Sequence, residues 1–206
     1  GLTNGKQWAK IWRAMNDVIR LRGNSFETVI KKTGGEERVI EQDFGRSGHF
    51  AESQSVPDLV KVSAATGDTV CVGPFRFAKF DVEFSAMVEL EHREEAYAIC
   101  EGIVDEIVDR ELAALREIKR ENKSLENEMS GGGILHQMTF RVEYGCTIPT
   151  GRFESTRIAV GATEMVGENE ALEIALSRVQ AFVERRIVAR KERVLRDSSQ
   201  AATAGT

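Results

Sequence analysis

The chain has 206 residues, of which 41% are hydrophobic and 30% are charged, and its formal net charge is −5. It contains no apolar run of about 18 residues, so we expect neither a membrane-spanning helix nor a membrane partner. The first residues lack the apolar core and cleavage site of a signal peptide, and the three cysteines are far apart without a CxxC motif. A cytoplasmic protein with reduced thiols is therefore predicted.

Charge is distributed unevenly along the chain. Basic residues outnumber acidic ones seven to two in residues 1–32, whereas acidic residues outnumber basic ones 22 to 11 in residues 33–130. Residues 184–196 are basic again, with six basic and two acidic side chains. This pattern favours local basic patches, or pairing between the basic ends and the acidic middle of a neighbouring copy, over one uniformly basic surface.

Residues 1–58 are predicted to form an N-terminal helix and hairpin extension. Apolar residues recur at helical spacing over residues 4–22, and Gly23 is a typical stop signal. The "TGG" at residues 33–35 is typical of a turn between two strands, so a hairpin should follow the helix.

Residues 59–129 are predicted to form a first ββα unit. A strand, a turn at residues 66–68 and a short strand should precede the alternating stretch 76–90. That stretch places four apolar side chains on one face: Ala78, Phe80, Val82 and Phe84. A long amphipathic helix follows and is expected to continue to about Met129, where "SGGG" at residues 130–133 forms a flexible connection.

Residues 134–197 repeat the order strand, strand, helix, and the polar tail 198–206 is expected to be extended or disordered. Five pairs match at one constant offset: Gly73 with Gly151, Phe75 with Phe153, Lys79 with Arg157, Phe80 with Ile158, and Val82 with Val160. One ββα unit cannot cover its own apolar sheet face, whereas two units can share a sheet. The predicted fold is therefore α+β, with duplicated ββα units forming a mainly antiparallel sheet and helices on one face.

The opposite face of this sheet is the first candidate site. If Phe80 and Val82 point to the helices, their sequence neighbours point away, and Arg141 joins them if Phe140 and Val142 face the helices. Aromatic rings can stack on bases while cations contact phosphates, as single-stranded nucleic acid requires. The candidate nucleic-acid-binding residues are Phe75, Phe77, Lys79, Arg141, Phe153 and Arg157 on the sheet, with Arg186 and Arg190 on the C-terminal helix.

A different interpretation of the same residues stays open. The N-terminal helix or a second subunit could cover the aromatic face, and the basic C-terminal stretch is also typical of a solvated helix end. Two functions are therefore expected as alternatives. One is a non-enzymatic, oligomeric accessory protein that binds single-stranded DNA or RNA. The other is a protein-interaction or structural module that self-assembles or binds a host protein.

No catalytic residue is predicted. The sequence lacks a P-loop, a GxSxG motif and a strand-associated GxGxxG, and "GRSGHF" at residues 45–50 lacks the lysine of a phosphate-binding loop. His49, His92 and His136 stand at no metal-ligand spacing. We therefore expect no enzyme activity, no metal and no cofactor.

The strand "GRFESTRIAVG", followed by a helix that ends in "VERRIVARKE", resembles a family of small phage and prophage proteins. These proteins carry a Gly-aromatic-Glu-Ser-x-Arg strand before a long charged helix and are associated with replication or recombination genes. The resemblance covers about 45 residues, and is weaker around Arg76 and Phe77, which replace the Glu-Ser pair. It implies a viral or mobile-element protein that acts on nucleic acid or on a host machine, and it assigns no site residue.

Overall fold

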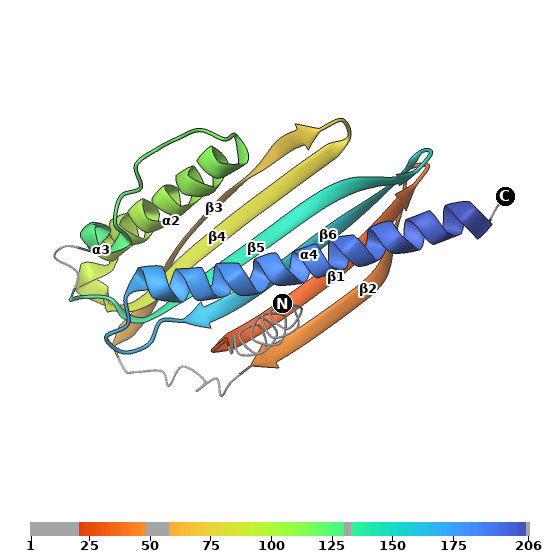
Figure 1. Cartoon of the computed structure of the whole chain (residues 1–206). Coiled ribbons are helices and arrows are strands. Elements are labelled where there is room, and N and C mark those ends of the chain that lie inside the picture. The colour runs from red at the N-terminus through yellow and green to blue at the C-terminus, as the bar shows by residue number, and fades with distance from the viewer. Residues whose placement is uncertain (1–20, 48–57, 130–132, 205–206) are drawn as a thin grey trace, which may run out of the picture.

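The computed structural model describes residues 21–47, 58–129 and 133–204, so the helix expected over residues 4–22 lies outside the described residues apart from its last two. Six strands form one antiparallel sheet in the order β2-β1-β6-β5-β4-β3 (Figure 1). The strands are β1 Gly23–Thr33, β2 Glu36–Ser47, β3 Leu59–Gly73, β4 Arg76–Glu89, β5 His136–Gly151 and β6 Glu154–Met165. The helices are η1 Leu90–His92, α2 Arg93–Leu115, α3 Leu125–Glu128 and α4 Leu172–Ala204. The predicted α+β class with an antiparallel sheet is confirmed.

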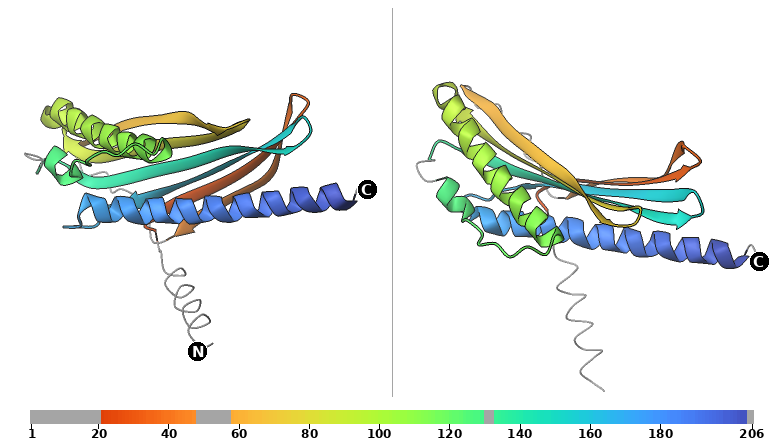
Figure 2. Two further views of the ribbon diagram at one scale, coloured as in Figure 1. Left: turned by 45° about the horizontal axis from the view of Figure 1, so that its top comes forward. Right: turned by 90° about the horizontal axis from the view of Figure 1, so that it is seen from above.

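Helices α2 and α4 cover the same face of the sheet (Figure 2), α2 over β3 and β4, and α4 over β5 and β6. Alternate residues of the central strands are buried beneath them, and cross-strand aromatic pairs pack there with their rings tilted to each other. The ring centroids of Phe80 and Tyr144 are 4.9 Å apart, and those of Phe84 and Phe140 are 4.8 Å apart. Each fully buried large apolar side chain contributes roughly 1.5–3 kcal/mol, so this layer supplies the main stabilisation of the fold.

Strands β1 and β2 form a hairpin that closes at Gly34 and Gly35, whose φ angles are 57° and 97°. Two consecutive positive φ angles define the turn type whose twist matches that of the flanking strands, and glycine adopts them without steric cost. This hairpin does not stand apart from the rest. It joins the sheet because β1 pairs with β6 from Ser25 to Thr33.

The prediction of a turn at residues 66–68 is wrong, because β3 runs through these residues without interruption. Gly67 lies opposite Asp81, and a Cβ atom at Gly67 would stand 2.5 Å from the carbonyl oxygen of Phe80 and 2.0 Å from the Asp81 carboxylate. A glycine within a strand pattern can mark either a turn or a close approach of another strand, and here it marks the close approach.

Helix α2 ends at Leu115, so the helix expected to reach Met129 is shorter than predicted. The Ile118 N–H donates to the carbonyl of Ala113 at 2.8 Å, and the Glu117 N–H donates to that of Ala114 at 3.2 Å. These bonds form a Schellman motif around Glu117, whose φ is 55°. The chain then returns along the helix to α3.

Replacing Glu117 with glycine should raise the free energy of unfolding by about 0.5–1 kcal/mol, because glycine adopts positive φ without the penalty that a Cβ atom causes. Urea unfolding followed by circular dichroism measures the change. Glu117→Ala serves as the control, since it removes the charge but keeps the Cβ atom and should give no comparable gain. Equal gains in both variants would show that the charge, and not the backbone, is responsible.

The tail was expected to be extended or disordered, but the structure describes it as helical as far as Ala204. The hydroxyls of Ser198 and Ser199 donate to the carbonyls of Val194 and Leu195 at 2.8 and 2.9 Å, and alanine is the best helix former. This end of α4 continues past the sheet (Figure 1). Among the described residues, no helix combines the length and apolarity needed to cross a bilayer.

Candidate functional site

The turns that join β1 to β2, β3 to β4 and β5 to β6 lie at the same end of the sheet (Figure 1). The turn at Gly34 contacts the β5–β6 turn directly, where the Gly34 N–H lies 3.5 Å from the carbonyl oxygen of Phe153. The β3–β4 turn stands apart from this pair, because the pairing between β4 and β5 ends at Phe77 and Thr147.

Phe75 and Phe153 occupy matched places in the β3–β4 and β5–β6 turns. Their φ angles are 54° and 63°, and each side chain is 82% exposed. Gly73 pairs with Arg76 and Gly151 pairs with Glu154, so each phenylalanine is the third residue of a tight turn. Glycine or asparagine is usual where that residue has positive φ. Both phenylalanines therefore combine backbone strain with an exposed ring, a combination that folding alone does not favour.

The open face of the sheet carries Phe77, Lys79, Arg141 and Arg157, as the alternation predicted. Lys79 Nζ lies 2.7 Å from Asp81 and 3.8 Å from Glu143, and the hydrogen bond to Asp81 raises the pKa of this lysine. Arg157 lies 3.6 Å from Glu37. Since carboxylates accompany these two cations, this part of the face is balanced in charge.

Arg141 is placed differently on the same face. Its guanidinium carbon lies 5.7 Å from the centre of the Phe26 ring, which is within the range of a cation–π contact. The Phe26 ring in turn lies on Gly161, where a Cβ atom would come within 2.2 Å of it. Glycine at position 161 therefore lets the Phe26 ring approach the backbone of β6 closely, beside Arg141.

Arg186 and Arg190 are not near the other candidate residues. They extend from α4 onto the helix-covered side of the sheet, where both bind the buried Glu27 carboxylate. Arg190 also bonds to Glu41 and Asp43 on β2. These arginines are engaged within the fold, and the sheet separates them from Lys79, Arg141 and Arg157.

Sequence reasoning missed a cleft between α2 and α4, with a volume of about 270 Å³. Phe80 and Tyr144 form its floor, Leu115 belongs to α2, and Ile187 and Val188 belong to α4. The apolar residues of both helices that line the cleft can be identified in the sequence. The distance between the helix axes, which creates the cleft, has no local sequence signal.

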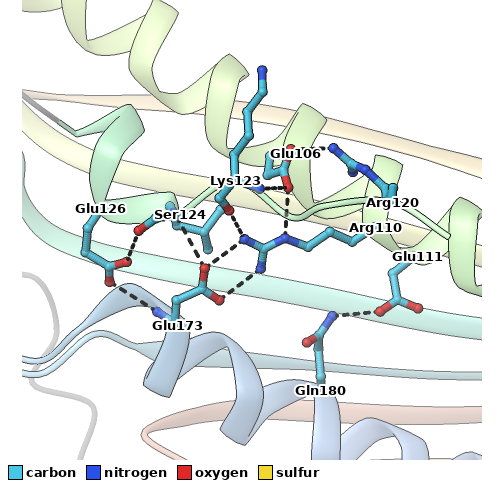
Figure 3. A network of polar contacts seen from close by, with 10 residues as sticks. Glu106, Arg110, Glu111, Arg120, Lys123, Ser124, Glu126, Glu173 and Gln180 are labelled. Carbon is cyan, nitrogen blue, oxygen red and sulfur yellow. Dashed lines mark hydrogen bonds and ion pairs between the residues drawn. The ribbon is translucent and has the colours of Figure 1, made fainter.

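The rim of the cleft is acidic at one end. Glu111 of α2 and Glu184 of α4 line it, and the Gln180 side chain donates to Glu111 at 3.1 Å (Figure 3). Burial, and then the charge of Glu184, raise the pKa of the Glu111 carboxyl. Lys191 lines the cleft two helical turns beyond Glu184. The acidic end is thus suited to a cation with an apolar neighbour.

No family model, curated protein or solved structure matches this chain. Function is therefore inferred from the geometry of the described residues.

A cluster of candidate cation ligands lies at the opposite end of the sheet from the turns. Glu89, Glu91 and His92 place ligand atoms within 4.8 Å of one another around η1, although His92 has no ligand spacing to the other histidines. Both glutamates are exposed. Exposed acidic groups commonly gather without an ion, so this cluster carries no functional assignment.

Proposed function

We propose that this chain is a non-enzymatic interaction module that assembles with copies of itself through its hairpin turns. The strained, exposed phenylalanines at positions 75 and 153 carry this proposal. A left-handed conformation costs a residue with a side chain roughly 1–2 kcal/mol, and an exposed ring recovers nothing from burial within its own chain. A contact with another molecule would bury the rings and explain why phenylalanine stands at both turns.

The duplication inferred from the sequence belongs to the same proposal. The element order β3, β4, α2 is followed by β5, β6, α4, and both strand pairs close on a turn with phenylalanine at the same place. Two copies of one ββα unit would account for both similarities. The matched turns would then be two versions of one contact element.

The double variant Phe75→Gly with Phe153→Gly tests the proposal. We expect the wild type to have a mass above that of one chain, and the variant to have the mass of one chain. At dilutions where both proteins are monomeric, the variant should also be more stable than the wild type by about 0.5–1 kcal/mol per turn, because glycine relieves the backbone strain. Light scattering coupled to size-exclusion chromatography measures the mass, and urea unfolding measures the stability.

Phe44→Ala is the matched control, since it removes a phenylalanine that is 77% exposed on the edge strand β2. This variant should keep the wild-type mass. A loss of assembly in Phe44→Ala alone would move the contact to the β2 edge, where an unpaired strand can recruit another. A wild type with the mass of one chain at every concentration would refute self-assembly.

Binding of single-stranded nucleic acid is the second candidate function. The position of Arg141 is the observation that favours it. Its guanidinium lies beside the Phe26 ring on the open face, with Lys79 on the neighbouring strand. A cation beside an aromatic ring is suited to a phosphate and a base. The carboxylates near Lys79 and Arg157 oppose this function, because they would repel phosphate.

Fluorescence anisotropy of a labelled single-stranded oligonucleotide tests this candidate at low and moderate salt. Binding should weaken steeply as salt rises, and Arg141→Glu or the pair Lys79→Glu with Arg157→Glu should weaken it further. Unchanged affinity in these variants would exclude the open face as the binding site.

A further inference from the structure

The β5–β6 turn presents an aromatic ring and a cation together. The guanidinium carbon of Arg152 lies 5.4 Å from the centre of the Phe153 ring, and both side chains are exposed. The turn is held in place, because Glu154 pairs with Thr33 of the adjacent strand and lies 2.9 Å from Lys31. A contact element that is already ordered loses less conformational entropy on binding than a mobile one.

The cleft between α2 and α4 is complementary to this turn, because it offers an apolar floor and carboxylates. Its floor and walls are mainly apolar, and its volume is about 270 Å³. Glu111 and Glu184 stand at one end of its rim, and Lys191 lines the cleft two helical turns beyond Glu184. A buried apolar cavity of about 150 Å³ is enough to hold a benzene ring, so one phenylalanine ring fits this volume. The two carboxylates come from different helices and line the same cleft, so a cation at that end would offset the repulsion between them.

We propose that the β5–β6 turn of one copy inserts into the cleft of a second copy, with Phe153 on the apolar floor and Arg152 beside Glu111 and Glu184. This inference rests on the proposed self-assembly and names its contact. The apolar ring would be buried, and the cation would meet two carboxylates in a partly dry site, where opposite charges attract more strongly than in water.

The contact joins two different surfaces of the chain. The turn lies at the end of the sheet, whereas α2 and α4 lie on the sheet face (Figure 2). A contact between unlike surfaces leaves one turn and one cleft unused in each pair, so the copies add head to tail into a ring or an open filament. A twofold contact would instead stop at the dimer.

Two variants, each with one surface broken, test the proposal when they are mixed. Phe153→Gly, made together with Phe75→Gly, removes the ring from both matched turns and keeps the cleft. Glu184→Arg places a cation on the rim of the cleft and keeps the turn. Each variant alone should have the mass of one chain. An equimolar mixture should give a complex of one chain of each kind, which cannot grow because its remaining surfaces are both broken.

Glu192→Arg is the matched control, because it makes the same change at an exposed position two turns along α4 and outside the cleft lining. It should assemble as the wild type does. A wild type that assembles, together with a mixture of the two broken variants that stays at the mass of one chain, would overturn the turn-in-cleft contact and leave self-assembly intact. A wild type that never exceeds the mass of one chain would overturn both.

Discussion

Replacing Arg190 with alanine is expected to lower the free energy of unfolding by about 2–4 kcal/mol, because it leaves carboxylates without their central cation. Arg190 Nε donates to Glu27 at 2.7 Å, and the other guanidinium nitrogens bond to Glu41 and Asp43. Glu27 is almost fully buried, so water cannot replace the lost partner. This arginine therefore fastens the second half of α4 to the outer strands β1 and β2.

Urea unfolding gives the size of the effect, and amide hydrogen exchange gives its location. Exchange should accelerate over the second half of α4 and over β2, while β4 and β5 stay protected. Arg196→Ala is the control, because Arg196 is exposed on the same helix, and it should change stability by less than about 0.5 kcal/mol. Equal effects of the two substitutions would show that Arg190 has no special structural role.

Replacing Glu106 with glutamine should lower the free energy of unfolding by about 2–4 kcal/mol. The reason is that this buried carboxylate accepts three hydrogen bonds from charged or backbone donors. Arg110 donates at 3.0 Å, Arg120 at 2.8 Å and the Lys123 N–H at 2.9 Å. Arg110 also binds Glu173 of α4, so the network joins α2, the returning segment and α4 (Figure 3). Loss of this network should weaken the packing between α2, the returning segment and α4.

The protonation of the Glu106 carboxylate should also make the stability of the protein depend on pH. Burial would raise the pKa of Glu106, but the bonds from Arg110, Arg120 and Lys123 outweigh burial and hold it below the ordinary value of 4.5. A depressed folded-state pKa stabilises the protein above the unfolded pKa, and this contribution is lost as pH falls through the folded pKa. The free energy of unfolding of the wild type should therefore exceed that of Glu106→Gln by its largest amount at neutral pH, and this difference should shrink below pH 4.5.

Glu101→Gln is the control for this experiment, because Glu101 is an exposed carboxylate on the same helix. It should alter stability by less than about 0.5 kcal/mol. A stability difference for Glu106→Gln that stays constant down to strongly acidic pH would show that the charge of Glu106 is not what holds the network together.

Much of the sheet follows from local sequence. The alternation around Phe80 and Val82 identified the buried side of β4, and Lys79 lies on the other side as expected. Gly34 and Gly35 marked the β1–β2 turn because only residues without a side chain accept both φ angles easily. These features depend on the geometry of a few neighbouring residues, so the sequence by itself determined them.

The partners of the charged side chains were decided by tertiary structure alone. Arg186 and Arg190 were expected to meet phosphates, yet they bind Glu27, which lies about 160 residues earlier in the chain. That pairing arises because β1 joins the sheet beside β6, under the path of α4. The cleft between α2 and α4 likewise depends on how far apart two helices lie on one sheet. Strand order and helix spacing are set by the packing of the whole chain, and no short stretch of sequence specifies them.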